Sequence, residues 1–97
     1  LPAAKANGRL QVSQAASLFF LQFGFRPEQW AVLAEAIKVQ ARGHAVVLTV
    51  DSPWGTRYSV EGPIDTPSGR QPRPRVRTVW ILEVGSERPR LITAHPV

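Results

Sequence analysis

A β-hairpin is predicted by residues 45–61, AVVLTVDSPWGTRYSVE. β-Branched and aromatic residues dominate both ends of this stretch, and Ser-Pro-Trp-Gly at 52–55 is typical of a tight turn. We therefore expect strands over 45–50 and 56–61. Because successive side chains of a strand point to opposite faces, Arg57 and Tyr58 should lie on opposite sides of the sheet.

Two further strands are predicted after the hairpin. Residues 62–74 hold four of the nine prolines, which excludes regular structure and predicts a long exposed loop. Strands are expected over 75–84 and from 90 to about 94, with a turn at 85–89. Arg75 and Arg77 should then share one face, and Thr93 and His95 should share one face of the last strand.

Two helices are predicted before the hairpin. Apolar residues recur at helical spacing over 12–23, with Ser13 as N-cap and Gly24 as the stop. The second helix is expected over 27–42, with a proline in its first turn. Its apolar stripe consists of Trp30, Leu33, Ala34, Ile37 and Ala41. We expect Trp30 and Trp80 in the core and Trp54 exposed at the hairpin tip.

These elements predict an α+β fold of order ααββββ, in which two N-terminal helices pack on one face of a four-stranded antiparallel sheet. The other face would stay partly open and could serve as a ligand surface. Residues 1–11 are expected to be a loose lead-in, and 12–97 a single domain. Because the chain starts at Leu1 and shows no signal-peptide pattern, we expect a domain excised from a longer protein.

Composition narrows the classes of function. The 97 residues are 43% hydrophobic and 20% charged, as in globular domains, and no apolar run approaches a membrane span. Without cysteine there are no disulfides or thiolate metal sites, and the two histidines show no metal-ligand spacing, so we expect no metal, cofactor or membrane partner. The net charge is +5, and ten of the twelve cations are arginine, which suits a polyanion such as RNA.

The strand-rich half carries a set of His, Arg, Thr and Tyr residues that can cleave RNA without a metal. A base takes the proton of a 2′-OH, which attacks the adjacent phosphorus. Arginines stabilise the charge that develops, and an acid protonates the leaving 5′-oxygen. The candidates for this chemistry are His44, Tyr58, Arg77, Thr93 and His95. The candidates for RNA contact are Trp54, Arg57, Arg70, Arg73 and Arg75.

Each candidate also has an ordinary structural role. His44 follows the second helix and could bond its last carbonyls. Tyr58 could sit at the edge of the core, and His95 on the surface near the terminus. Arginines on an edge strand prevent aggregation. These alternatives remain open on the sequence alone.

Several spaced motifs in the second half resemble a known family. They are PWGTRY at 53–58, VEGP at 60–63, TPSGR at 66–70, VRTVWI at 76–81 and PRLITAHP at 89–96. Over roughly 18–97 the chain resembles an uncharacterised bacterial domain family that occurs alone and at the C-termini of polymorphic toxins. In its element order it also resembles, more distantly, the barnase, EndoU, colicin and RelE-like ribonucleases.

The resemblance implies metal-free RNA cleavage, with tRNA among the substrates, carried by His44, Tyr58, Arg77 and Thr93. The closing motif more often has Tyr where this chain has His95. The resemblance also implies a C-terminal toxin module of a larger effector. Such a module is secreted or delivered by the producing bacterium, acts in the target-cell cytoplasm, and is neutralised by an acidic immunity protein.

Three hypotheses follow. The first is a metal-independent endoribonuclease, which requires His44 or His95 on one open face with Arg77 and Thr93. The second is a basic module that binds RNA or protein without catalysis. The third is a structural or adaptor domain, which is favoured if the arginines of the sheet pair with Glu61 and Glu83.

Overall fold

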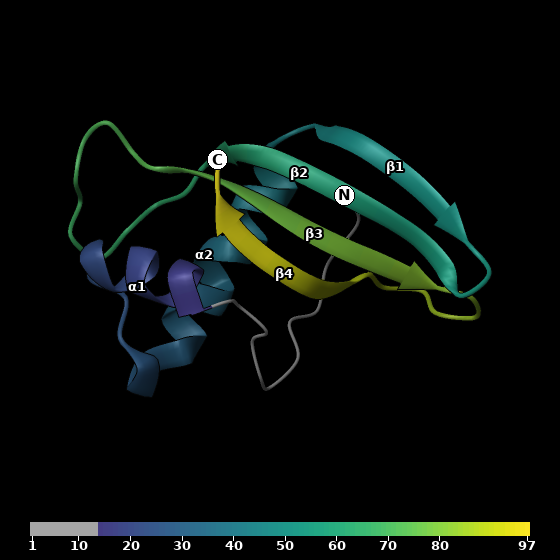
Figure 1. The fold of residues 1–97 in the computed structure, drawn as a ribbon, viewed down its shortest axis with the longest axis horizontal. Helices are drawn as coiled ribbons and strands as arrows, with labels where there is room; N and C mark the ends of the chain where they lie inside the picture. Colours follow the sequence, from purple (N-terminus) through teal and green to yellow (C-terminus); the bar gives the residue numbers. More distant parts are fainter. Residues whose placement is uncertain (1–13) are drawn as a thin grey trace.

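The computed structural model describes residues 14–97 and has an α+β fold. The predicted N-cap Ser13 and the lead-in 1–11 lie outside this range. The order is helices first and strands second, and the observed ends differ from the predicted ones by a few residues. The elements are α1 (Gln14–Gln22), the 3-10 turn η1 (Pro27–Gln29), α2 (Trp30–Gly43), β1 (Val46–Ser52), β2 (Gly55–Pro63), β3 (Arg75–Glu83) and β4 (Arg90–Pro96) (Figure 1).

The strands form one antiparallel sheet in the order β1-β2-β3-β4. Gly55 begins β2 against β3, where an added Cβ would run into the carbonyl of Leu82, so the hairpin needs glycine there. The register shifts at Val47 in β1 and at Ile92 in β4, which marks a bulge in each edge strand.

One face of the sheet is covered by α2, and we call the other the open face. Val76, Thr78 and Trp80 of β3 are fully buried on the covered side. Alternation therefore places the intervening β3 residues on the open face. Register extends that face to neighbouring strands. The open face includes Leu48, Val50, Arg57, Ser59, Glu61, Arg75, Arg77, Val79, Ile81, Glu83, Arg90, Thr93 and His95.

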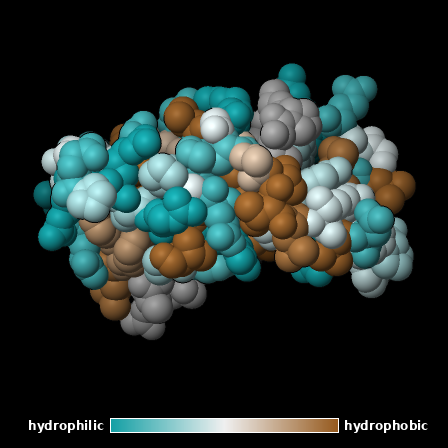
Figure 2. All heavy atoms as spheres, turned by 90° about the horizontal axis from the view of Figure 1, so that it is seen from above, coloured by the Kyte–Doolittle hydropathy of each residue, from teal (hydrophilic) through white to brown (hydrophobic). Residues whose placement is uncertain are grey.

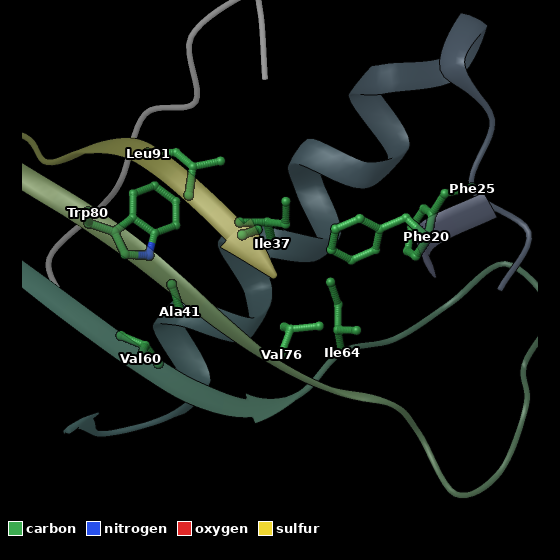
Figure 3. Close-up of a cluster of buried hydrophobic side chains, with 10 residues drawn as sticks. Phe20, Phe25, Ile37, Ala41, Val60, Ile64, Val76, Trp80 and Leu91 are labelled. Atoms are coloured by element: carbon green, nitrogen blue, oxygen red, sulfur yellow. The ribbon is translucent and has the colours of Figure 1, made fainter. Parts of the chain in front are cut away.

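The core lies between α2 and the covered face of the sheet. Figure 3 shows Ile37 and Ala41 of α2 directed at Val60, Val76 and Trp80, all of them fully buried. Trp80 therefore is a core residue, as predicted. Beyond the end of the sheet the core continues through a second group of apolar side chains, Phe20, Phe25 and Ile64.

A buried polar chain fixes α2 to the sheet. Trp80 Nε1 donates to Thr78 Oγ1, and that hydroxyl donates to Gln40 Oε1, both at 2.9 Å. Gln40 Nε2 lies 3.2 Å from the carbonyl oxygen of Val76, to which it donates, and is also directed at two carbonyls of β2. Among the described residues no buried side-chain nitrogen or oxygen lacks a partner, so this polar chain does not weaken the core.

The helix α1 does not lie flat on the sheet beside α2. It sits beyond the sheet end, next to the loop that joins β2 and β3 (Figure 1). Gly24, with φ +94°, ends its last turn and sends the chain back towards α2. The amide of Ser68 then donates to the carbonyl of Phe23 at 3.3 Å, so the proline-rich loop is held against α1.

Two expectations from the sequence need correction. Trp30 was expected in the core, but it is 44% exposed, because α2 turns its buried face to the sheet only from Leu33 and Ala34 onward. The loop after β2 is also not exposed throughout. Ile64 is fully buried, and its amide donates to the carbonyl of Pro74 at 3.0 Å, which closes the base of the loop.

Between residues 14 and 97, none of the helices combines the length and the apolar character that a membrane crossing requires.

Candidate active site on the open sheet face

Three ionisable residues form a row across the open face, near the end of the sheet where β3 begins. Arg77 of β3 pairs in register with Glu61 of β2 on one side and with His95 of β4 on the other. Directly paired residues of antiparallel strands point to the same face, and their Cα atoms lie about 5 Å apart. The row therefore places an acid, a guanidinium and an imidazole next to one another.

Glu61 and Arg77 form an ion pair within this row. Arg77 Nε donates to Glu61 Oε2 at 2.7 Å, and Nη2 donates to the same oxygen. The Glu61 side chain is only 24% exposed and that of Arg77 38%. Partial burial strengthens the pair relative to one in open water. Because both guanidinium donors go to one carboxylate oxygen, Arg77 keeps three of its five N–H groups for a ligand.

Thr93 lies beside the row. It shares the open face with His95, as predicted, and pairs in register with Val79 of β3. Thr93 is thus the next residue on the open face after His95 in β4, and its partner Val79 is the next one after Arg77 in β3. The structure therefore brings together three of the five residues selected for RNA cleavage, namely Arg77, Thr93 and His95.

The other two, His44 and Tyr58, lie on the covered side of the sheet. Tyr58 pairs in register with the buried Trp80. His44 Nδ1 donates to the carbonyl of Gln40 at 2.8 Å and caps the end of α2. Its ring rests on Gly62, where an added Cβ would lie 2.6 Å from His44 Cδ2. The sheet separates both side chains from Arg77, because alternation directs Tyr58 to the covered side and the His44 ring lies against Gly62, which is paired with the buried Val76.

The arginines selected for RNA contact are divided. Arg57 and Arg75 are exposed on the open face, and neither forms an ion pair within residues 14–97. In the loop, Arg73 pairs with Asp65 at 2.9 Å, and the Arg70 guanidinium lies 5.6 Å above the ring of Phe23. The loop arginines therefore hold the loop rather than extend the open face.

Trp54 is 75% exposed at the β1–β2 turn, as expected. Next to it, the amide of Val84 donates to the Trp54 carbonyl at 3.0 Å, so the two hairpin turns meet at this end of the sheet. This end is the far end of the open face from Arg75. Trp54 therefore lies apart from the row around Arg77.

Glu61 was not selected from the sequence, although a signal was present. Glu61 is four residues after Arg57 in β2, so the two side chains lie on the same face of the strand, and that face was expected to be the one away from Tyr58. What the sequence did not provide was the register across the long loop, which alone shows that Glu61 faces Arg77. A second pair, Arg90 Nε with Glu83 Oε1 at 2.6 Å, lowers the positive charge of the same face further along.

Other places in the described chain offer less chemistry. A shallow pocket of about 270 Å³ lies between α2 and the loop and is mostly apolar, with Asp65 as its one ionisable residue. Within residues 14–97 no cluster of three His, Asp or Glu side chains could hold a metal ion.

The order of the three side chains in the row is compatible with in-line displacement at phosphorus. Neighbouring strands lie about 4.8 Å apart, so Glu61 and His95 stand on opposite sides of Arg77. A phosphate held by Arg77 would have a base on one side and an acid on the other. Attacking and leaving oxygens also lie on opposite sides of phosphorus in such a displacement.

Comparison with known proteins gives a family for this chain. Residues 9–97 match the model of a domain family described as a domain of unknown function, DUF6883. The chain belongs to this family. The resemblance to an uncharacterised domain family is thereby confirmed at that level. No curated protein and no solved structure matches the DUF6883 chain.

Proposed function

We propose that this DUF6883 domain is a metal-independent endoribonuclease whose active site is the row formed by Glu61, Arg77 and His95. The observation that carries the proposal is the register of β2, β3 and β4, which aligns a carboxylate, a guanidinium and an imidazole across one exposed face. Thr93, beside the row, would bond a phosphate oxygen of the substrate.

In the proposed reaction, Glu61 accepts the proton of a ribose 2′-OH, and that oxygen bonds to the adjacent phosphorus. The bond from phosphorus to the 5′-oxygen breaks, and His95, protonated at the start, gives its proton to that oxygen. The products are a 2′,3′-cyclic phosphate and a free 5′-OH. Arg77 holds the phosphate and stabilises the negative charge that grows on its oxygens in the transition state.

The Glu61–Arg77 pair supports this division of roles. Arg77 fixes the orientation of the Glu61 carboxylate through one of its two oxygens, and the fixed guanidinium needs no reorganisation when charge develops on the phosphate. His44 and Tyr58 have no part in this mechanism, because they lie behind the sheet.

The proposal extends to the biological setting. A ribonuclease of this size would be the toxin module of a larger bacterial effector, delivered into the cytoplasm of a target cell. An acidic immunity protein would cover the open face, where Arg57 and Arg75 remain without ion pairs among the described residues.

One observation favours the alternative of a structural or adaptor domain. Arg77 and Arg90 are both paired with glutamates, as a structural or adaptor domain would have them, which lowers the positive charge of the open face. The two interpretations differ in what happens to RNA. A structural or adaptor domain leaves RNA intact, whereas the proposed enzyme cleaves it.

The test is cleavage of single-stranded RNA by the purified domain in the presence of EDTA. We expect fragments that end in a 2′,3′-cyclic phosphate, and no cleavage of the same sequence as DNA. Glu61→Gln and His95→Ala should each lower the rate by about a hundredfold or more, which is the usual contribution of one acid or base. Intact RNA after prolonged incubation with folded wild type would exclude the enzyme.

A matched control is available on the same face. Glu83→Gln disrupts the second glutamate–arginine pair as Glu61→Gln disrupts the first, but Glu83 lies away from His95. Its cleavage rate should equal that of the wild type. Equal losses in the two variants would show that charge pairing on the face, rather than proton transfer at Glu61, supports activity.

Expression of wild type and of an Arg77→Ala/His95→Ala double variant in bacteria tests the toxin role, since only wild type should arrest growth.

A further inference from the structure

The edge strand β1 is the least protected part of the fold. Within residues 14–97 it pairs only with β2, and the helices pack under β2 and against β4. Val46 to Asp51 are exposed on both faces of the strand. Figure 2, seen from above this edge, shows a hydrophobic patch where β1 lies, formed by Val46, Val47, Leu48 and Val50.

The two edges of the sheet differ in how they are defended. Native sheets block an exposed edge with charges, proline or bulges. β4 has a bulge at Ile92, charged Arg90 at its start and Pro96 at its end. β1 has a bulge at Val47, but it carries neither a charge nor a proline from Val46 to Val50. Its outward N–H and C=O groups are therefore open to another strand.

We propose that β1 pairs antiparallel with β1 of a second copy, about a two-fold axis at Thr49, to join two sheets into one. Strand length and side chains are self-complementary in this arrangement. Leu48 of each copy lies opposite Val50 of the other, and all four side chains fall on the open face. No like charges meet within the paired stretch, since Asp51 is opposite Val47.

The charges beside β1 do not oppose a second copy. Arg42, before the strand, is paired with Glu35 at 3.3 Å, and Asp51 at its far end lies opposite Val47 of the other copy. An isologous contact of this kind closes on itself, so it forms a dimer and leaves no free β1 edge. Both open faces then lie on the same side of the joined sheet, independently of the function proposed for them.

The first measurement is sedimentation equilibrium of the purified chain from micromolar to near-millimolar concentration. We expect a dimer that dissociates on dilution, since a single strand pair buries less than a standard interface. Thr49→Lys places two ammonium groups opposite each other and should raise the dissociation constant at least tenfold. Val39→Lys, at a half-exposed site on α2, should leave it unchanged.

A cross-linking experiment tests the register and can trap a weak dimer covalently. The chain has no cysteine, so Thr49→Cys introduces a single thiol. Residues directly opposite in antiparallel strands have Cα separations that a disulfide can span. We expect rapid covalent dimerisation under mild oxidation, and slow dimerisation for Val39→Cys. A wild type that stays monomeric at all concentrations, or equal cross-linking of the two variants, would overturn the proposal and leave the edge to a strand of another protein.

Discussion

At the scale of single residues, the two histidines differ in their surroundings. His44 bonds the carbonyl of Gln40 at 2.8 Å and rests on Gly62, so its surroundings are those of a helix cap. His95 lies beside Arg77 on the open face, and the structure gives its side chain no hydrogen bond among the described residues. An imidazole without a structural partner is available for a substrate.

This difference predicts opposite effects of two alanine substitutions. His44→Ala removes the bond to the α2 carbonyl and should lower the free energy of unfolding by about 1 kcal/mol, with RNA cleavage unchanged below the unfolding transition. His95→Ala should leave stability within about 0.5 kcal/mol and lower the cleavage rate by about a hundredfold or more. Urea unfolding and cleavage assays on both variants measure this. Loss of cleavage in a folded His44→Ala protein would return His44 to the site.

The sequence predicted which residues of one strand share a face, but not which face is open. Alternation correctly separated Arg57 from Tyr58 and grouped Thr93 with His95. It could not relate one strand to the next, because a long loop separates β2 from β3 and bulges shift the register at both edges. Glu61 therefore was missed, and His44 and Tyr58 were selected for a face that they do not reach.

At the scale of elements, α2 is positioned by polar as well as apolar contacts. Ile37 and Ala41 pack against the sheet through apolar contacts, which are not directional. Gln40 adds direction, because its amide is bonded to the Thr78 hydroxyl and to the Val76 carbonyl. The hydrogen bonds thus select one placement of α2, and with it the face of the sheet that stays open.

The Thr78 hydroxyl is the centre of this polar chain, so its removal should be costly. Thr78→Val keeps the shape of the side chain but leaves Gln40 Oε1 and Trp80 Nε1 buried without partners. We expect a loss of about 2 kcal/mol in the free energy of unfolding. Thr56→Val, which removes a hydroxyl that bonds Asp51 on the surface, should change stability by less than about 0.5 kcal/mol. Equal losses in urea unfolding of the two variants would contradict this role.

The local sequence predicted which segments form helices and strands, but it did not predict how these elements pack together. The hairpin, the breaks at Gly24 and Gly43, and the periodic stripe of α2 are local signals, and the structure has these elements near the expected places. The placement of α1 depends on the loop that folds back onto it, through Ser68 and Phe23, which local periodicity does not report. The prediction that Trp30 is buried was wrong for the same reason. Trp30 belongs to the apolar stripe of α2, but it lies at the exposed first position of the helix.

At the scale of the whole molecule, the charge of +5 was visible in the sequence but its pairing was not. The charge of the open face is set mainly by four arginines and two glutamates. Two of the arginines are paired, and Arg57 and Arg75 are exposed. The face is thus moderately positive rather than a strongly basic patch. Few arginines of the open face are therefore free to contact the phosphates of bound RNA. This limits both the affinity for RNA and the dependence of that affinity on salt.

The salt dependence of RNA binding tests this distribution of charge. We use a 2′-O-methylated oligonucleotide, which keeps the phosphates but offers no 2′-OH for attack. If Arg57, Arg75 and Arg77 each contact one phosphate, the slope of log K against log salt should be about −2, since each contact on a single strand contributes about −0.7. Arg57→Ala/Arg75→Ala should then reduce the slope to about −0.7. Arg26→Ala/Arg42→Ala removes the same net charge from the helical layer and should leave the slope unchanged. If the two double variants behave alike, the oligonucleotide responds to overall charge and the open face is not its binding surface.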